Sequence, residues 1–203
     1  MKNTLISTET QIVFDEHKKI EEIVPVTRNE AHRIIEECML CANVAAADFL
    51  NSHKLDALYR VHEGPKVEKL NNLRAYLGTL SLVLGGGEKP RPADYRALME
   101  EIVDRADAHL IQVMLLRSMN QAVYQMENRG HFGLAYDAYA HFTSPIRRYP
   151  DLLVHRAIKS VIRSRRKSTG VKRIKGVGAL PKAAIYPYAP ADVIAAGAHC
   201  SML

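Results

Sequence analysis

The chain has no long hydrophobic run. No stretch of its 203 residues approaches the roughly 18 uncharged apolar residues that a membrane helix needs. The N-terminal segment MKNTLISTETQIVFDEHKK lacks an apolar core followed by a small-residue cleavage site, so it does not predict a secretory signal. We therefore expect a soluble, cytoplasmic chain that does not contact a membrane.

Cysteine is scarce. Three cysteines, an odd number, fit a reducing compartment and a chain without structural disulfides. Cys38 and Cys41 form a CxxC motif, but they lie within IIEECMLCANVAAADFL, which has a helical pattern. This context favours two small buried side chains over a zinc or redox site.

Acidic residues are almost missing from one region. Between positions 147 and 182 there are twelve Lys and Arg residues and a single acid, Asp151, whereas the whole chain has a formal charge of only +6. A basic region of this kind favours a polyanionic partner such as nucleic acid, bound through phosphate contacts. The alternative is a solvated basic loop at about 164–182, because RSRRKSTGVKRIKGVG is rich in Gly, Ser and Lys.

The fold predicted from periodicity is α+β, predominantly helical with a few short strands. At 47% hydrophobic and 25% charged residues, the composition is that of one ordinary globular domain. Short strands are expected in TQIVFDE and KKIEEIVPV. Helices are expected after the cap Asn29, from near Pro65 to the glycines at 85–87, over 91–105, and over 107–128.

Apolar spacing also predicts which faces of the first two helices are buried. The predicted faces are Ala31, Ile34, Ile35, Cys38, Ala42, Ala45 and Phe49 in the first helix, and Val67, Leu70, Leu73, Leu77 and Leu80 in the second.

The stretch HFGLAYDAYAHFTSPIRRYPDLLVH, residues 131–155, concentrates histidine, tyrosine and arginine. One or two short strands are expected over 131–142, followed by a helix that Thr143 or Ser144 caps, with Pro145 in its first turn and a kink at Pro150. The N-terminus of such a helix suits an anion. Because successive helical residues are about 100° apart, only one of Arg147 and Arg148 could bind a phosphate there, the other facing solvent or an acid.

This stretch resembles the signature of the ribonuclease II/R family, the RNB exoribonucleases. RNEAHRIIEECMLCANVAAADFL, ALYRVHEGP, LRAYLGTL and LLRSMNQAVYQMENRGHFGLA are similar to the bacterial ribonuclease R branch of that family. The resemblance covers nearly the whole chain and is weakest over the basic loop. It implies a processive, magnesium-dependent 3′-to-5′ exoribonuclease that hydrolyses single-stranded RNA, from its 3′ end, to nucleoside monophosphates.

The resemblance also implies roles for particular residues. Arg147 matches the arginine that binds the phosphate near the RNA 3′ end, where its charge would stabilise the transition state; the alternative is an arginine that only pairs with a carboxylate. Glu37, or its neighbour Glu36, matches a glutamate beside the RNA, with a solvated helix face as the alternative.

Further predicted RNA contacts are Arg148, Thr143, Ser144, Tyr149 and His141. For Tyr149, His141 and Tyr139 the alternative is a core residue; His155 is expected to be a buried, hydrogen-bonded histidine and Asp151 to pair with an arginine.

The family pattern has parts that this sequence lacks. Its magnesium ligands are a cluster of aspartates, and no run of several aspartates within a few residues exists here, so no metal ligand is predicted in this chain. We expect residues 1–203 to be the C-terminal portion of an RNB catalytic domain, without a separate cold-shock or S1 domain. A surface exposed where the missing half packs would favour self-association.

Two functions therefore stand side by side. The first is an exoribonuclease of which this chain supplies the arginine side of the site and part of the RNA channel wall, and which is inactive without the rest. The second is a non-catalytic fragment that binds RNA weakly or only folds.

Overall fold

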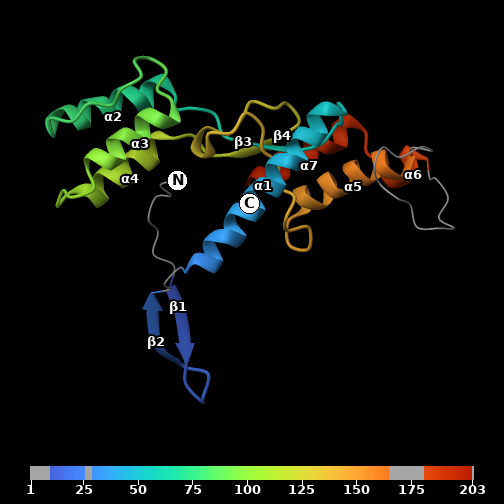
Figure 1. The fold of residues 1–203 in the computed structure, drawn as a ribbon, viewed down its shortest axis with the longest axis horizontal. Coiled ribbons are helices and arrows are strands. Elements are labelled where there is room, and N and C mark those ends of the chain that lie inside the picture. The colour runs from blue at the N-terminus through green and yellow to red at the C-terminus, as the bar shows by residue number, and fades with distance from the viewer. Residues whose placement is uncertain (1–9, 26–28, 165–180, 203) are drawn as a thin grey trace. The chain divides into compact units, whose positions relative to one another are not determined.

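The computed structural model describes residues 10–25, 29–164 and 181–202 (Figure 1). These form two compact units, Met1–Met39 and Leu40–Leu203, and helix α1 (Glu30–Ser52) contributes to both. No helix in the described ranges is long and apolar enough to cross a membrane. Most of the predicted basic loop falls on residues 165–180, outside the described residues.

The first unit contains an antiparallel hairpin of β1 (Thr10–Phe14) and β2 (Ile20–Pro25), which confirms the two predicted strands. Its turn is held by Asp15, whose Oδ1 accepts hydrogen bonds of 2.8 Å from the backbone N–H groups of His17 and Lys19. The register pairs Ile12 with Ile23. Because side chains alternate across a strand, apolar residues collect on one face of the hairpin.

Helix α1 begins as predicted but buries a different face. Asn29 caps it, since its Oδ1 accepts a 3.0 Å bond from the His32 N–H. The predicted face is mostly wrong: Ile34 and Ile35 are each 61% exposed, and Cys38 and Cys41 are also exposed rather than buried, whereas Phe49 is half-buried and packs against the core. The buried residues of α1, offset by one position and so turned by about 100°, are Asn43, Ala46, Ala47 and Leu50.

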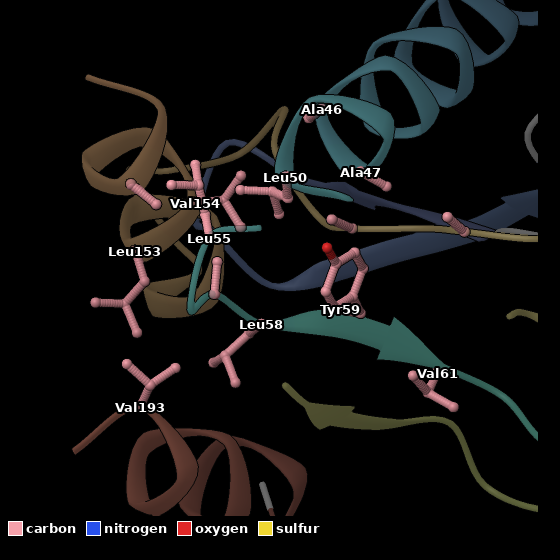
Figure 2. Close-up of a cluster of buried hydrophobic side chains, with 14 of the residues drawn as sticks. Ala46, Ala47, Leu50, Leu55, Leu58, Tyr59, Val61, Leu153, Val154 and Val193 are labelled. Atoms are coloured by element: carbon pink, nitrogen blue, oxygen red, sulfur yellow. The ribbon is translucent and has the colours of Figure 1, made fainter. Parts of the chain in front are cut away.

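One core of the second unit joins segments that are distant in the sequence. The C-terminal half of α1 packs with β3 (Tyr59–Val61), β4 (Val123–Gln125), α5 (Tyr149–Ser164) and α7 (Pro190–Met202) (Figure 2). Strand β4 pairs antiparallel with β3, and its Tyr124 N–H donates a 2.8 Å bond to Ser201 Oγ of α7. The short helix α6 (Lys182–Ile185) packs against α5.

A second core consists of α2 (Val67–Thr79), α3 (Pro92–Glu101) and α4 (Ala108–Ser118), rich in leucine. Leu70, Leu73 and Leu77 of α2 are buried as predicted, whereas Val67 is 67% exposed. Helix α2 ends at Thr79, before the glycines at 85–87 that were expected to stop it, because the chain turns back over Leu77 through hydrogen bonds from the Leu80 and Leu82 N–H groups.

Helix α4 is shorter than its pattern predicts, since it ends at Ser118 rather than 128. The Asn120 side chain donates a 2.6 Å bond to the Gly64 carbonyl, and Val123–Gln125 then pairs with β3. Pairing across the sheet therefore overrides the helical pattern of this segment, which ends in the β-favouring residues Val123 and Tyr124.

The segment from 131 to 148 also differs from the prediction. In place of strands it has a 3₁₀ turn, η1 (Phe132–Leu134), with single bridges from His131 to His62 and Tyr136. Residues 145–147 form a turn and α5 begins only at Tyr149, so Thr143 and Ser144 do not cap it and the arginines precede it. Pro150 does not kink the helix, because it lies in the first turn, where its missing N–H has no intrahelical partner to lose.

Candidate nucleic-acid interface

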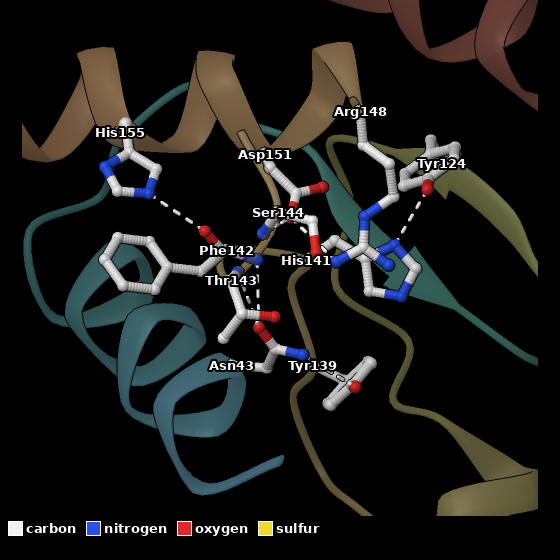
Figure 3. Close-up of polar contacts among 10 residues, drawn as sticks. All are labelled: Asn43, Tyr124, Tyr139, His141, Phe142, Thr143, Ser144, Arg148, Asp151 and His155. Carbon is white, nitrogen blue, oxygen red and sulfur yellow. Dashed lines mark hydrogen bonds and ion pairs between the residues drawn. The ribbon is translucent and has the colours of Figure 1, made fainter. Parts of the chain in front are cut away.

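Asn43 holds the loop that leads to the arginines. This side chain of α1 is only 3% exposed, and its Oδ1 accepts bonds from the backbone N–H groups of Phe142, at 2.9 Å, and Thr143, at 3.2 Å (Figure 3). Its Nδ2 donates a 2.8 Å bond to the Tyr139 hydroxyl. Asn43 thus uses two bonds to fix irregular backbone, which has no strand partner to satisfy it, and a third to hold the Tyr139 side chain.

Asp151 holds the other side of the same loop. One carboxylate oxygen, Oδ1, accepts 2.8 Å bonds from both the Ser144 N–H and the Arg148 guanidinium (Figure 3). The Asp151 side chain is fully buried and that of Arg148 is 25% exposed. The expectation that Asp151 pairs with an arginine is confirmed, and Arg148 is the arginine that turns to an acidic partner.

Arg147 has a different environment from its neighbour. Its backbone N–H bonds the Ser144 carbonyl at 3.3 Å, closing the turn, while its side chain is exposed and makes no hydrogen bond or ion pair with the residues that the structure describes. Ile146 beside it is fully exposed, and Tyr149 is 46% exposed. The side chains of Arg147 and Tyr149 are therefore exposed to solvent, whereas the Arg148 side chain stabilises the loop through its ion pair with Asp151.

His141 lies between this loop and the β3–β4 ribbon. Its Nδ1 shares a 2.7 Å hydrogen bond with the hydroxyl of Tyr124. Burial, together with the positive charges of Arg148, Arg60 and Arg147, lowers the pKa of His141 to about 4, against the opposite effect of Asp151. His141 is therefore neutral at pH 7, in a region of positive potential.

Tyr139 and His155 prove to be structural. Tyr139 is 5% exposed, and burial raises the pKa of its hydroxyl. The His155 ring stacks on Phe142 with centroids 4.0 Å apart, and its Nε2 lies 2.9 Å from the Phe142 carbonyl. Tyr139 is thus a core residue, which was the alternative to an RNA contact. His155 forms a hydrogen bond as expected, although it is half-buried rather than buried.

His62 and His131, whose rings are in contact, support η1. His62 accepts a 2.9 Å bond at Nδ1 from the Gly133 N–H and contacts the Asn120 carbonyl at 2.8 Å through Nε2, which fixes it as the neutral Nε2–H tautomer. A Cβ at Gly133 would lie 2.7 Å from that Nδ1, so only glycine allows this approach. His131 accepts at Nδ1 from the Leu134 N–H at 3.2 Å, and burial lowers its pKa to about 4.

The predicted site residues are thus only partly brought together. Thr143, Ser144, Arg148 and His141 surround the Asn43 and Asp151 supports, with Arg147 and Tyr149 on the same loop. Three buried side-chain atoms there, Thr143 Oγ1, Arg148 Nε and Asp151 Oδ2, have no hydrogen-bond partner among the described residues. Glu36 and Glu37 are exposed on the part of α1 that belongs to the first unit, so their role at the site stays a prediction.

The described residues do not fit the magnesium that the family resemblance implies. Within the described ranges, no group of three or more His, Cys, Asp and Glu side chains could hold a metal ion. The one fully buried carboxylate at the loop, Asp151, is already committed to Arg148 and Ser144.

Three residues of the site were missed by sequence reasoning. Asn43 had a detectable signal, a polar residue in register with the apolar residues Ala46, Ala47 and Leu50. Tyr124 was hidden within a segment predicted to be helical. Arg60 of β3 lies within the family-like stretch ALYRVHEGP, but a single arginine on a short strand does not reveal what lies opposite it.

Comparison with known proteins finds relatives that match most of this chain. The protein-family model of the RNB domain matches residues 2–164 of this chain. Ribonuclease R of Escherichia coli is 47% identical over 196 residues, covering 97% of this chain and 23% of that protein. Ribonuclease R of Vibrio cholerae is 58% identical over 156 residues, covering 77% of this chain and 19% of that protein.

A solved structure shows the same fold. RNase R of Mycoplasma genitalium, in complex with ribose-methylated single-stranded RNA, is 32% identical, with a TM-score of 0.70 over 77% of this chain and 25% of that one. The chain thus spans about a quarter of the length of these relatives or less. With a matching domain model over most of its length and relatives near half identity, this chain belongs to the RNB domain family.

Proposed function

We propose that this chain is part of a 3′-to-5′ exoribonuclease that hydrolyses RNA to nucleoside monophosphates. In this proposal residues 1–203 form the C-terminal portion of the catalytic domain and supply the arginine side of its site. This proposal rests on the Asp151–Arg148 ion pair, which leaves Arg147 exposed on the signature loop and without a hydrogen bond or ion pair to any residue that the structure describes. The similarity to ribonuclease R, including a relative solved with single-stranded RNA, supports RNA as the ligand.

The chemical role of Arg147 follows from where it lies. An exposed guanidinium can bind a phosphate through two parallel N–H bonds. As the phosphate is attacked, negative charge grows on its oxygens, and a cation already in place stabilises that charge without reorganising. Arg147 would therefore act mainly on the transition state, with Tyr149 and His141 available to ribose or base.

Magnesium belongs to the complete protein in this proposal. The described residues offer no metal site, so the ligands would lie in the three quarters of the relatives' length that this chain does not cover. The second candidate is a non-catalytic fragment that binds RNA weakly. It is favoured by the same lack of a metal site among the described residues.

The test needs a complete enzyme. Residues 1–203 would replace the matching segment of Escherichia coli ribonuclease R, and single-turnover hydrolysis would be measured beside equilibrium RNA binding. We expect Arg147→Ala to reduce the rate by on the order of 100-fold or more, and to weaken binding far less because other phosphate contacts remain. Arg96→Ala, at an exposed position on α3, is the matched control.

Two results would count against this role. Near-normal turnover of Arg147→Ala would show that the arginine is not at the reacting phosphate. An equal loss of rate and affinity would make Arg147 an ordinary binding contact. Arg147→Lys separates charge from geometry, since a lysine keeps the charge but cannot form the two-pronged contact.

A further inference from the structure

Arg60 of β3 is a second arginine whose side chain forms no ion pair with the residues that the structure describes. Its cross-strand partner is Tyr124, and its guanidinium carbon lies 4.4 Å from the centre of the Tyr124 ring. A cation over an aromatic face at this distance is attracted by the ring. Stacking on a ring leaves the edge of the guanidinium, with its N–H donors, available.

No carboxylate neutralises Arg60 among the residues that the structure describes. Its side chain is half-buried and forms no ion pair there. A half-buried charge is normally paired, because removing it from water is unfavourable. Asp151, whose charge acts on Tyr124 together with that of Arg60, is already bonded to Arg148.

Arg60 also belongs to the same electrostatic region as the signature loop. The Tyr124 ring beneath it carries the hydroxyl that is bonded to His141. The charges of Arg60, Arg147 and Arg148 all lower the pKa of His141. Three guanidinium groups therefore act on one neutral histidine, while a single carboxylate opposes them.

We propose that Arg60 binds a backbone phosphate of single-stranded RNA, as a second phosphate-binding residue beside Arg147 and held in place by the ring of Tyr124. This inference rests on the proposed function, because it assumes that RNA reaches the signature loop. A phosphate is the expected ligand because the guanidinium offers planar donors and a positive charge that no carboxylate in the described ranges pairs with.

The experiment measures binding of a fluorescently labelled, unstructured single-stranded RNA to the chain itself over a series of KCl concentrations. Arg60→Gln, Arg147→Gln and Arg96→Gln each remove one positive charge, and Arg96 lies exposed on α3 as the matched control. Each lost phosphate contact should lower the slope of log affinity against log salt by about 0.7, or about fivefold in affinity near 0.1 M salt. We expect this for Arg60→Gln and Arg147→Gln, and not for Arg96→Gln.

A chemical readout distinguishes contact from folding. Phenylglyoxal modification followed by mass spectrometry should show that RNA protects Arg60 and leaves Arg96 reactive. This modification experiment uses the unaltered chain, so it tests contact between Arg60 and RNA even if Arg60→Gln lowers the melting temperature. Equal modification of Arg60 with and without RNA would overturn the inference.

The binding outcomes separate the two proposals. If Arg147→Gln weakens binding while Arg60→Gln behaves like Arg96→Gln, the inference fails and the proposed function stands. If the unaltered chain binds RNA without salt dependence, or Arg147→Gln binds like the unaltered chain, the phosphate site of the proposed function is wrong, and the inference falls with it.

Discussion

The buried carboxylate of Asp151 lies 2.8 Å from the guanidinium of Arg148. This pair determines which of two adjacent arginines faces outward. Because the same Asp151 oxygen also accepts the Ser144 N–H, the side chain fixes both the turn and its second arginine. Arg147 is left exposed by the support that its neighbour receives.

Removing the carboxylate should destabilise the fold. Asp151→Ala leaves the Arg148 guanidinium and the Ser144 N–H without their acceptor, and breaking a buried ion pair by deleting one partner costs about 3–5 kcal/mol. Urea unfolding would measure it. Asp151→Asn, which keeps one oxygen acceptor, should lose less. A free energy of unfolding for Asp151→Ala within about 1 kcal/mol of the unaltered chain would contradict a supporting role.

Removing the Asn43 side chain should lower the free energy of unfolding nearly as much. Asn43→Ala deletes the acceptor of the Phe142 and Thr143 N–H groups and the donor to Tyr139, and unsatisfied buried polar groups cost roughly 1–3 kcal/mol each. We expect a loss of about 2–4 kcal/mol in urea unfolding. Asn51→Ala, on the exposed side of the same helix but bonded to the Tyr59 hydroxyl, is a control with one bond to lose. Equal losses for the two variants would show that the loop does not depend on Asn43.

Two half-buried histidines make stability dependent on pH. His131 and His141 have pKa values of about 4 in the folded chain, below the ordinary value of 6.5. Between these values the unfolded chain binds more protons, so stability is complete above pH 6.5 and falls as the pH drops towards 4. We expect a loss of roughly 1 kcal/mol per histidine between pH 7.5 and 5, allowing for their partial exposure to solvent.

The variants His131→Asn and His141→Asn test this assignment, since an amide can replace the hydrogen bonds of Nδ1 but does not titrate in this range. Together they should flatten the pH dependence of urea unfolding. A double variant with an unchanged dependence would assign the effect to other groups.

The exposed apolar face of the β1–β2 hairpin should promote self-association of the chain. Ile12, Phe14, Ile20 and Ile23 share one face of β1–β2 and are 44–60% exposed. An exposed cluster of this kind favours association. We propose that the chain self-associates at high concentration, and that Ile12→Thr with Ile23→Thr reduces both association, followed by sedimentation, and binding of a hydrophobic dye. Val83→Thr, at a separate exposed position, is the control. A strictly monomeric chain without dye binding would contradict the proposal.

The chain alone should not degrade RNA. The sequence has no run of closely spaced aspartates, and two-metal hydrolysis needs several carboxylates that converge on ions about 4 Å apart. With magnesium present, a nuclease-free preparation is expected to release no nucleoside monophosphates from single-stranded RNA, measured beside active Escherichia coli ribonuclease R. Their appearance, if abolished by Arg147→Ala, would show that the chain carries its own metal site.

Local sequence determined the elements that depend on local interactions. The Asn29 cap, the leucines of α2, Pro92 at the start of α3 and the β1–β2 strands all follow from spacing, capping and alternation within a few residues. The family was also readable, because the signature over 131–155 has many fixed positions. The local pattern failed where a partner distant in sequence was decisive, as for β4, which pairs with β3 some sixty residues earlier.

The site shows the same division more sharply. The sequence by itself determined that Arg147, Arg148 and Asp151 lie close together, because four residues cannot separate them far. Only the tertiary structure decided which arginine is paired: the loop is bent by Asn43 from α1, about a hundred residues away, and Asp151 is buried, so one oxygen must satisfy both the Ser144 N–H and Arg148. It likewise placed Arg60 on Tyr124, since the register between two strands is fixed by packing across the whole core and not by either strand alone.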